Sequence, residues 1–254
     1  MLTMKLTFLG VCSALSVGYK NFQSNMLIES TNAKHLLIDC GGDVRNSLHE
    51  LGYTSSTIDA VYISHLHADH VGGLEWLGFS KFFIDKQQPE LYISQDQSAR
   101  LWNNVLSGGM STLEESTASL ETFFKVMPIQ DQSFMWEKIQ FQLIKVIHSY
   151  SNQQLLPSYG LFIQGAKLKI FISTDARFSP ELLAPIYQQA DLIFQDCETS
   201  AFRSKQHAHY NDLKNLAPNI KQKMWLYDYN DGQLPDAIQD GFKGFITRGQ
   251  MFNF

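Results

Sequence analysis

The chain has 254 residues, of which 44% are hydrophobic and 18% are charged, and its formal net charge is -5. This composition excludes a largely disordered chain, and the length predicts one α/β domain over residues 1–254. The acidic balance disfavours a surface that holds structured nucleic acid by neutralising its phosphates.

Three widely spaced cysteines (Cys12, Cys40 and Cys197) lie in apolar surroundings, and none belongs to a Cys-x-x-Cys pair. We therefore expect buried, reduced thiols, as in a cytoplasmic protein. The apolar run near the amino terminus is too short for a signal peptide, and nowhere do 18 apolar residues follow one another. The sequence thus predicts a cytoplasmic protein that does not bind a membrane.

Ten short apolar runs, rich in β-branched and aromatic residues and bounded by turn residues, predict strands. They lie at 5–10, 25–30, 35–42, 60–65, 90–95, 141–148, 159–165, 168–174, 190–196 and 224–229. Helical patterns follow several of them, at 44–52, 98–106, 179–190 and 211–218. Ser179 before Pro180 is typical of a helix start. Residues 107–119 read as a long polar connector, either a lid or a surface loop.

The stretch "SHLHADH" places His65, His67, Asp69 and His70 directly behind the apolar run 60–63. Side chains at the carboxyl end of a buried strand face a crevice in α/β folds. Imidazole and carboxylate groups suit zinc, manganese or iron(II), and four of them suit two adjacent ions. The alternative is a histidine-rich surface loop.

Further candidate residues follow later apolar runs. His148 ends the run 141–148, Asp175 follows the run 168–174, and His207 and His209 lie in "KQHAHYNDL". Taken alone, His148 could be a histidine at a strand end in the core, and Asp175 could be a turn or capping residue. Clustering of such residues at strand ends is nevertheless what a metal centre built from distant loops requires.

Together these motifs resemble the metallo-β-lactamase superfamily. The pattern HxHxDH, His148 in "HSYSNQQLLPSYGLFI" and Asp175 in "ISTDARF" carry the resemblance. Within the superfamily, "TFLGVCSA", "LLIDCGG", "ADLIFQDCET" and "HAHYNDLKNLA" are similar to the ribonuclease Z-like phosphodiesterase branch. The resemblance implies an αββα sandwich, with two mixed β-sheets face to face, helices outside and a two-metal site along one edge.

The resemblance also implies the roles of individual residues. One metal ion would be bound by His65, His67 and His148, and the second by Asp69 and His70, with Asp175 bridging the two. Where the branch has a further histidine ligand, this chain has Asp228 in "MWLYDYNDG". The ions would be zinc, with manganese as the alternative, and the aspartate would favour oxygen-loving ions.

Two histidines compete for a further role in the branch, contact with the substrate phosphate. His207 keeps the spacing of the branch to the following helix, and His209 is its rival. The implied reaction is hydrolysis by a metal-activated water, with Asp69 orienting or deprotonating the nucleophile and His207 or His209 serving the phosphate.

The short segment between His148 and Asp175 indicates the class of substrate. That segment is too short for the arm with which transfer-RNA-processing members grip their substrate. The chain therefore resembles the armless cyclic-nucleotide phosphodiesterases of the anti-Pycsar type and their bacterial relatives, which implies a small phosphodiester as substrate and a homodimer. Tyr19, Phe22 and the segment 108–110 could line a nucleotide pocket or merely pack their loops.

Three alternatives remain open at this stage. The first is an RNA 3′-end nuclease of the ribonuclease Z type. The second is a lactonase or thioesterase of the same superfamily. The third is a protein that binds a nucleotide without catalysis.

Overall fold

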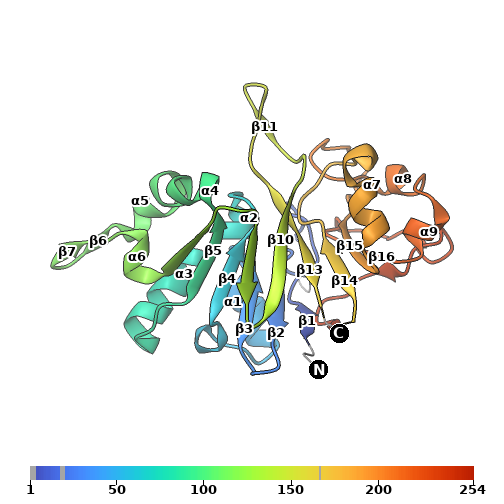
Figure 1. Cartoon of the computed structure of the whole chain (residues 1–254). Helices are drawn as coiled ribbons and strands as arrows, with labels where there is room; N and C mark the ends of the chain where they lie inside the picture. The colour runs from blue at the N-terminus through green and yellow to red at the C-terminus, as the bar shows by residue number, and fades with distance from the viewer. Residues whose placement is uncertain (1–3, 18–20, 166) are drawn as a thin grey trace.

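The computed structural model describes residues 4–17, 21–165 and 167–254, and it has two seven-stranded sheets that face each other (Figure 1). In spatial order, the first sheet contains β18 (Met251–Asn253), β1 (Lys5–Phe8), β2 (Met26–Glu29), β3 (His35–Ile38), β4 (Ala60–Ile63), β5 (Glu90–Ser94) and β8 (Lys125–Ile129). The second contains β17 (Gly244–Phe245), β16 (Met224–Tyr227), β15 (Leu192–Asp196), β14 (Lys169–Ile172), β13 (Tyr159–Gln164), β10 (Ile139–Lys145) and β9 (Ser133–Trp136). All ten predicted strands are confirmed.

Both sheets are mixed. In the first, β1 to β3 pair antiparallel, and β3, β4, β5 and β8 run parallel. In the second, β9, β10, β13 and β14 pair antiparallel, whereas β14 to β17 run parallel. Since parallel strands end at the same edge of a sheet, the residues after β14, β15 and β16 meet there.

Helices cover both outer faces, which confirms the αββα arrangement (Figure 1). The first part of the chain contributes α1 (Val44–Glu50), η1 (Ser55–Thr57), α2 (Ala68–Val71), α3 (Leu74–Phe79), η2 (Ser80–Asp85), α4 (Gln95–Arg100), η3 (Leu101–Leu106), α5 (Ser107–Met110) and α6 (Leu120–Phe123). The second part contributes α7 (Pro180–Gln189), α8 (Tyr210–Leu213) and α9 (Pro218–Lys221). Among the described residues, no helix combines the length and the apolar character needed to cross a membrane.

The helix start predicted at Ser179 and Pro180 is confirmed, and the start predicted at residue 98 is displaced. Pro180 occupies the first turn of α7, where its missing N–H costs nothing, and the carbonyl of Ser179 accepts the N–H groups of Leu182 and Leu183. The Ser179 side chain makes no capping hydrogen bond. The helix predicted at 98–106 begins earlier, at Gln95, and continues into the π-type turn η3.

The core between the sheets is aromatic. The Phe134 ring stacks with those of Tyr92, Phe141 and Tyr62, with centroid distances of 4.4, 4.7 and 5.8 Å. Residues of β10 alternate between buried and exposed, as expected for a strand with one face on a core, whereas β4 is buried throughout. Each such large side chain stabilises the fold by about 1.5–3 kcal/mol when fully buried. The three cysteines are buried and unpaired, as predicted.

The segment 107–119 is not a long loop. It forms α5 and a hairpin of β6 (Thr112–Leu113) and β7 (Ser116–Thr117), which projects from the outer side of the first sheet (Figure 1). The Met110 side chain is fully buried in the core beneath the helices, so the suggestion that it lines a nucleotide pocket is wrong. Phe22 lies under the Arg248 guanidinium at 5.2 Å, and Tyr19 lies outside the described residues.

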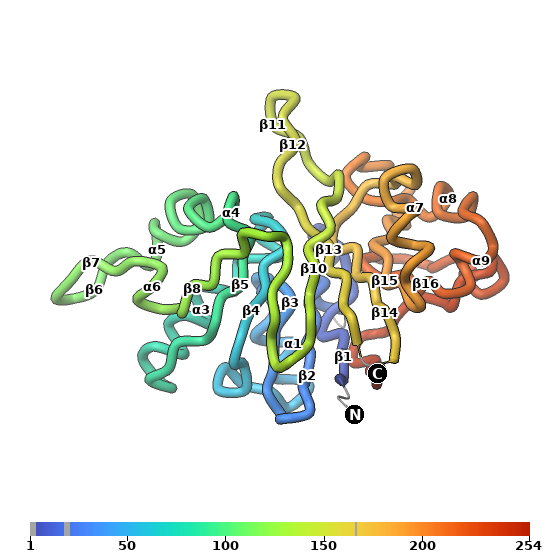
Figure 2. The backbone as a smooth tube through the Cα atoms, in the orientation of Figure 1, coloured from blue at the N-terminus to red at the C-terminus, as the bar shows by residue number. Residues whose placement is uncertain are grey.

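A second hairpin, β11 (Tyr150–Ser151) and β12 (Gln154–Leu155), stands above the end of the sandwich beyond β10 and β13 (Figure 2). With β13 and β14, it fills the chain between His148 and Asp175. The segment therefore contains no domain-sized arm, as the sequence predicted.

Candidate metal centre

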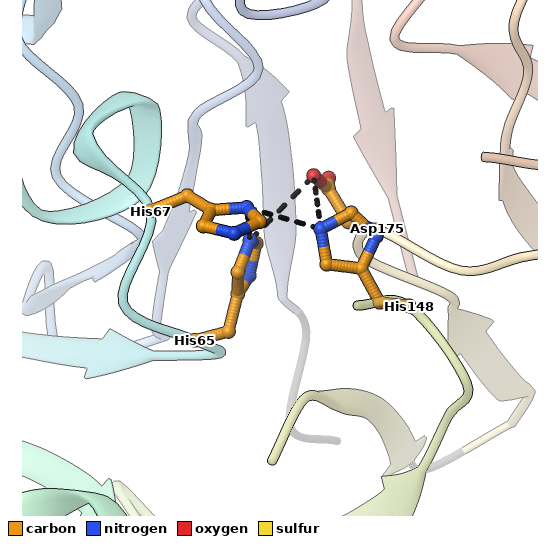
Figure 3. A group of neighbouring side chains, drawn as sticks. All are labelled: His65, His67, His148 and Asp175. Atoms are coloured by element: carbon orange, nitrogen blue, oxygen red, sulfur yellow. Dashed lines mark hydrogen bonds and ion pairs between the residues drawn. The ribbon is translucent and has the colours of Figure 1, made fainter. Parts of the chain in front are cut away.

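The predicted ligands meet at one edge of the sandwich, where strands of both sheets end. His65, His67, His148 and Asp175 form the histidine group, which comes from the chain after β4, β10 and β14 (Figure 3). His67 Nδ1 lies 3.0 Å from Nε2 of both His65 and His148. Asp175 Oδ2 lies 3.6 Å from each of these two Nε2 atoms.

The electrostatics of the histidine group suit a cation. Burial lowers the pKa of His148 to about 4 and holds the pKa of His65 well below its usual range. The pKa of His67 is lowered for the same reason. These imidazoles are therefore neutral at physiological pH, with lone pairs that can bind a metal ion. The exposed His67 leaves the group accessible from solvent.

Hydrogen bonds outside the group fix which ring nitrogen faces inward. His148 Nδ1 donates to the Gln206 carbonyl at 2.9 Å. His65 Nδ1 lies 3.0 Å from Ser64 Oγ, which itself donates to Asp39 Oδ2 at 2.7 Å. The same Asp39 oxygen accepts from Nδ1 of His70 at 2.8 Å. Asp39 thus orients one imidazole in each of two groups, a role that ligand motifs in the sequence do not reveal.

Replacing Asp39 by asparagine is expected to weaken metal binding about 10- to 100-fold, the usual effect of losing an outer hydrogen-bond partner. Asp39 has a left-handed backbone with φ of 60°, which asparagine tolerates, so the change is confined to the side chain. Competition with a coloured chelator measures the affinity, and Asp191→Asn on the surface is the control. Unchanged affinity would show that Asp39 does not orient the imidazoles.

A second group consists of Asp69, His70 and Asp175. His70 Nε2 lies 3.1 Å from Asp69 Oδ2 and 3.3 Å from Asp175 Oδ2. Burial alone would lower the pKa of His70, but the surrounding carboxylates of Asp175, Asp69 and Asp39 raise it well above its usual range. His70 in turn lowers the pKa of Asp69 against the effect of burial. Three carboxylates around one imidazole give this group a net negative charge that a divalent cation would balance.

A third group, which we call the carboxylate group, joins Asp175, Asp196, His207 and Asp228. His207 Nδ1 lies 3.0 Å from Asp196 Oδ2, 3.4 Å from Asp228 Oδ2 and 4.0 Å from Asp175 Oδ2. Burial raises the pKa of Asp196 to about 6, and it raises that of Asp228 well above the usual range, with help from the neighbouring carboxylates. Asp175 belongs to all three groups, the position that a bridging ligand requires.

Asp196 was missed in the sequence, although it ends a predicted strand. The strand β15 lies between β14 and β16 in parallel, so its last residue reaches the edge where Asp175 and Asp228 lie. Asp196 Oδ2 also accepts the N–H of Ala176 at 2.8 Å. It therefore holds both His207 and the chain that carries Asp175.

The two candidate histidines of "KQHAHYNDL" have different surroundings. His209 begins α8, where its Nδ1 accepts the N–H of Asn211 and its Nε2 lies 3.1 Å from the Ser200 carbonyl. Both of its ring nitrogens are thus engaged in holding local structure. His207 points into the carboxylate group with 17% of its side chain exposed, against 3% or less for the three carboxylates. Of the two, only His207 both contacts the carboxylate group and is partly exposed there.

Backbone strain marks the same edge. Thr174 and Asp228 have left-handed φ angles of 49° and 62°. This conformation is unfavourable for a β-branched residue, and the Thr174 hydroxyl compensates by donating to backbone carbonyls, among them that of Ser173 at 2.7 Å. Strain of this kind persists where the surrounding structure imposes it, and here it sets the direction of Asp175.

The unpaired polar atoms of the site match the requirements of divalent ions. His70 Nε2, Asp175 Oδ1, Asp196 Oδ1 and Asp228 Oδ2 are buried without a hydrogen-bond partner in the described chain. Buried polar atoms rarely remain so, because each carries a desolvation cost. Imidazole nitrogens with one carboxylate fit zinc, and the richer set of carboxylates around Asp228 fits an oxygen-preferring ion. The residues therefore fit two divalent ions.

The two facing sheets and the outer helices form the metallo-β-lactamase fold, and the imidazole and carboxylate groups at its edge could hold metal ions. The metallo-β-lactamase fold protein YhfI from Bacillus subtilis has a TM-score of 0.76 to this structure at 20% identity, covering 100% of both chains. A family model for the anti-Pycsar protein Apyc1 matches residues 4–252.

Two relatives carry the same family name. The anti-Pycsar protein Apyc1 of Paenibacillus harenae is 32% identical over 231 residues, which cover 90% of each chain. That of Bacillus phage vB_BsuM-Goe3 is 30% identical over 259 residues, covering 98% of this chain and 97% of its own. This chain belongs to the anti-Pycsar protein Apyc1 family.

Proposed function

We propose that this protein is a metal-dependent phosphodiesterase that hydrolyses nucleoside 3′,5′-cyclic monophosphates to mononucleotides. The observation that carries the proposal is the set of three ligand groups that share Asp175 at one sheet edge, in a chain of the Apyc1 family. The sequence resemblance to armless cyclic-nucleotide phosphodiesterases supports the substrate class. Two divalent ions, when bound, would supply positive charge to hold the phosphate and would acidify a water molecule so that it can attack.

We propose that the ligands are divided as the sequence resemblance implies. His65, His67 and His148 would hold one ion, Asp69 and His70 the other, and Asp175 both. Asp228 would join the second set through Asp175, with which it shares the carboxylate group, and its Oδ2 is buried without a hydrogen-bond partner among the described residues. We expect zinc at the histidine group, with manganese accepted at the carboxylate-rich second site.

Asp69 and His207 would carry out the two proton transfers of the reaction. Asp69 is ionised because His70 lowers its pKa, so its carboxylate can orient the attacking water and accept its proton. Asp196 and Asp175 raise the pKa of His207 against the effect of burial, which favours the protonated ring. The imidazolium can therefore donate a hydrogen bond to the developing charge on the phosphate or protonate the leaving alkoxide. No covalent intermediate is needed.

The structure disfavours the other reactions of the superfamily to different degrees. An RNA nuclease lacks support because only the short β11–β12 hairpin stands between β10 and β13. A lactonase or thioesterase would have less use for a protonated His207, which suits a phosphate. A nucleotide binder without catalysis would not need an ionised Asp69 that can act as a base beside the metal ligands.

The cytoplasmic location and the homodimer stay predictions, the first supported by three unpaired cysteines.

The proposal is tested by chromatography of zinc- or manganese-loaded protein with a panel of 3′,5′- and 2′,3′-cyclic mononucleotides. We expect metal-dependent formation of mononucleotide from the 3′,5′-cyclic compounds. His67→Ala should abolish it, because the histidine group then loses a central nitrogen. His49→Ala, a change to an exposed histidine on α1, is the matched control.

The outcomes separate the alternatives. Turnover of RNA ends or of a lactone, without turnover of cyclic nucleotides, would overturn the proposal in favour of the corresponding hydrolase. Stoichiometric binding of a nucleotide by protein that contains two metal ions, without turnover, would show that the protein is a binder.

A further inference from the structure

A pocket of about 130 Å³ opens beside the histidine group. One wall consists of His65, His67 and His148, and a second is formed by Gln97 and Arg100 of α4. The segment 156–158, at the foot of the β11–β12 hairpin, completes the lining. A phosphodiester held at the metal centre would therefore have one of its substituents in this pocket.

Gln97 lines the pocket, and its side-chain amide has a fixed orientation. Gln97 is 1% exposed, and its Nε2 donates to the Ser64 carbonyl and to Ser94 Oγ, both at 3.1 Å. A carbonyl can only accept, so the amide nitrogen must lie on that side and Oε1 on the other. Gln97 Oε1 is buried and has no hydrogen-bond partner in the described chain. A buried acceptor left unpaired is costly, which suggests that a ligand N–H completes it.

Hydrogen bonds hold the residues around Gln97 in place. Ser94 Oγ and Tyr159 Oη both donate to the Asp96 carboxylate, which ties the start of α4 to the start of β13. Ser64 is the residue before His65 and accepts at its carbonyl from the N–H of Tyr159. The acceptor is thus held in a constant relation to the histidine group, as a residue that selects substrates must be.

The second polar group is Arg100, three residues after Gln97 and so on the same face of the helix. Arg100 is exposed, and within the described ranges no carboxylate pairs with its guanidinium. Leu66, Leu156 and Pro157 add half-buried apolar surface. The pocket therefore offers apolar surface, a planar cation and the amide oxygen of Gln97, beside the hydroxyl groups of Ser149 and Ser158.

This combination matches a heteroaromatic ring, whose faces are apolar and whose edge carries N–H donors. Guanidinium planes stack on such rings, and a pocket near 150 Å³ in size holds a single six-membered ring. We infer that this pocket binds the nucleobase of the substrate, with Gln97 Oε1 accepting an N–H of the base and Arg100 stacking on its face. The inference rests on the proposed function and names the part of the substrate that the protein reads.

The first test removes the base rather than the enzyme's own groups. The value of kcat/KM is measured for cytidine and adenosine 3′,5′-cyclic monophosphates and for the abasic 1-deoxyribose 3′,5′-cyclic phosphate. Arg100→Ala should lower the ratio of the first values to the last at least about tenfold, mainly through KM. Arg45→Ala, on an exposed arginine of α1 outside this pocket, is the matched control.

The second test blocks the N–H on the base. The N4,N4-dimethylcytidine and N6,N6-dimethyladenosine cyclic phosphates keep the ring but lose the donors of the exocyclic amine. Wild-type protein should hydrolyse them at least about tenfold less efficiently than the parent compounds, because Gln97 Oε1 stays unpaired. Gln97→Met should abolish this discrimination, with circular dichroism as the check on folding.

Failure of the inference is distinguishable from failure of the proposed function. Turnover of cyclic nucleotides with the same ratio in Arg100→Ala, and without discrimination against the dimethyl compounds, would overturn the base pocket alone. If no cyclic phosphate is hydrolysed, the proposed function fails. Dissociation constants of the parent and abasic compounds are then measured by equilibrium dialysis and compared in the same way. Equal constants for the parent and abasic compounds would then overturn the base pocket as well.

Discussion

Replacing Asp175 by asparagine is expected to reduce kcat/KM for a cyclic nucleotide at least about 1,000-fold, well beyond the 10- to 100-fold effect of an outer hydrogen-bond partner. Asp175 is 2% exposed, and its carboxylate belongs to every ligand group of the site. His70 and His207 hold its pKa well below the usual range against the effect of burial, so it is fully charged. Asparagine keeps the shape but removes the charge and one acceptor oxygen.

Metal content distinguishes loss of the ions from loss of folding. After dialysis, elemental analysis should find about two ions per wild-type chain and fewer in Asp175→Asn. Added metal should raise the melting temperature of the wild type but hardly that of the variant, because ligand binding stabilises only the protein that binds it. Asp131→Asn, at an exposed position, is the control. A variant that keeps both ions and most activity would remove Asp175 from the bridging role.

The strands predicted from the sequence are those of the sheet interiors. Runs such as 60–63 and 170–172 are apolar throughout because both of their faces are covered, and this gives a strong signal. The strands of these two sheets that were missed, β8, β9, β17 and β18, lie at sheet edges. β8 contains Pro128, which suits an edge strand but argues against a strand in a sequence, and β9 alternates over only four residues. Edge position comes from pairing between distant segments, which a single sequence does not display.

The candidate site was predictable where its residues are neighbours in sequence. The motif HxHxDH places four possible metal ligands at one strand end and one helix start. Such a pattern rarely occurs outside metal sites. Asp39 and Asp196 were missed because a single aspartate after a strand is common in turns and caps. Only the parallel pairing of β3 with β4, and of β14 with β15, brings them beside His65 and Asp175.

His207→Ala is expected to affect catalysis, and His209→Ala is expected to affect stability. The comparison shows which of the two histidines acts on the phosphate, a choice that the sequence left open. His207→Ala should reduce kcat about 100- to 10,000-fold, the range for loss of a general acid. His209→Ala should retain most of the activity but lose about 1 kcal/mol of the free energy of unfolding, because α8 loses the side chain that caps its first turn.

The pH profile adds a readout that a merely structural role would not change. Neighbouring carboxylates raise the pKa of His207, so the wild type should keep its imidazolium to higher pH than an ordinary histidine and lose kcat as pH rises through that pKa. His207→Ala should lack this decline, and His209→Ala should retain it. If instead His209→Ala loses the decline and the activity, the proton comes from the residue that begins α8, and the ring of His207 serves only to balance the charge of Asp196 and Asp228.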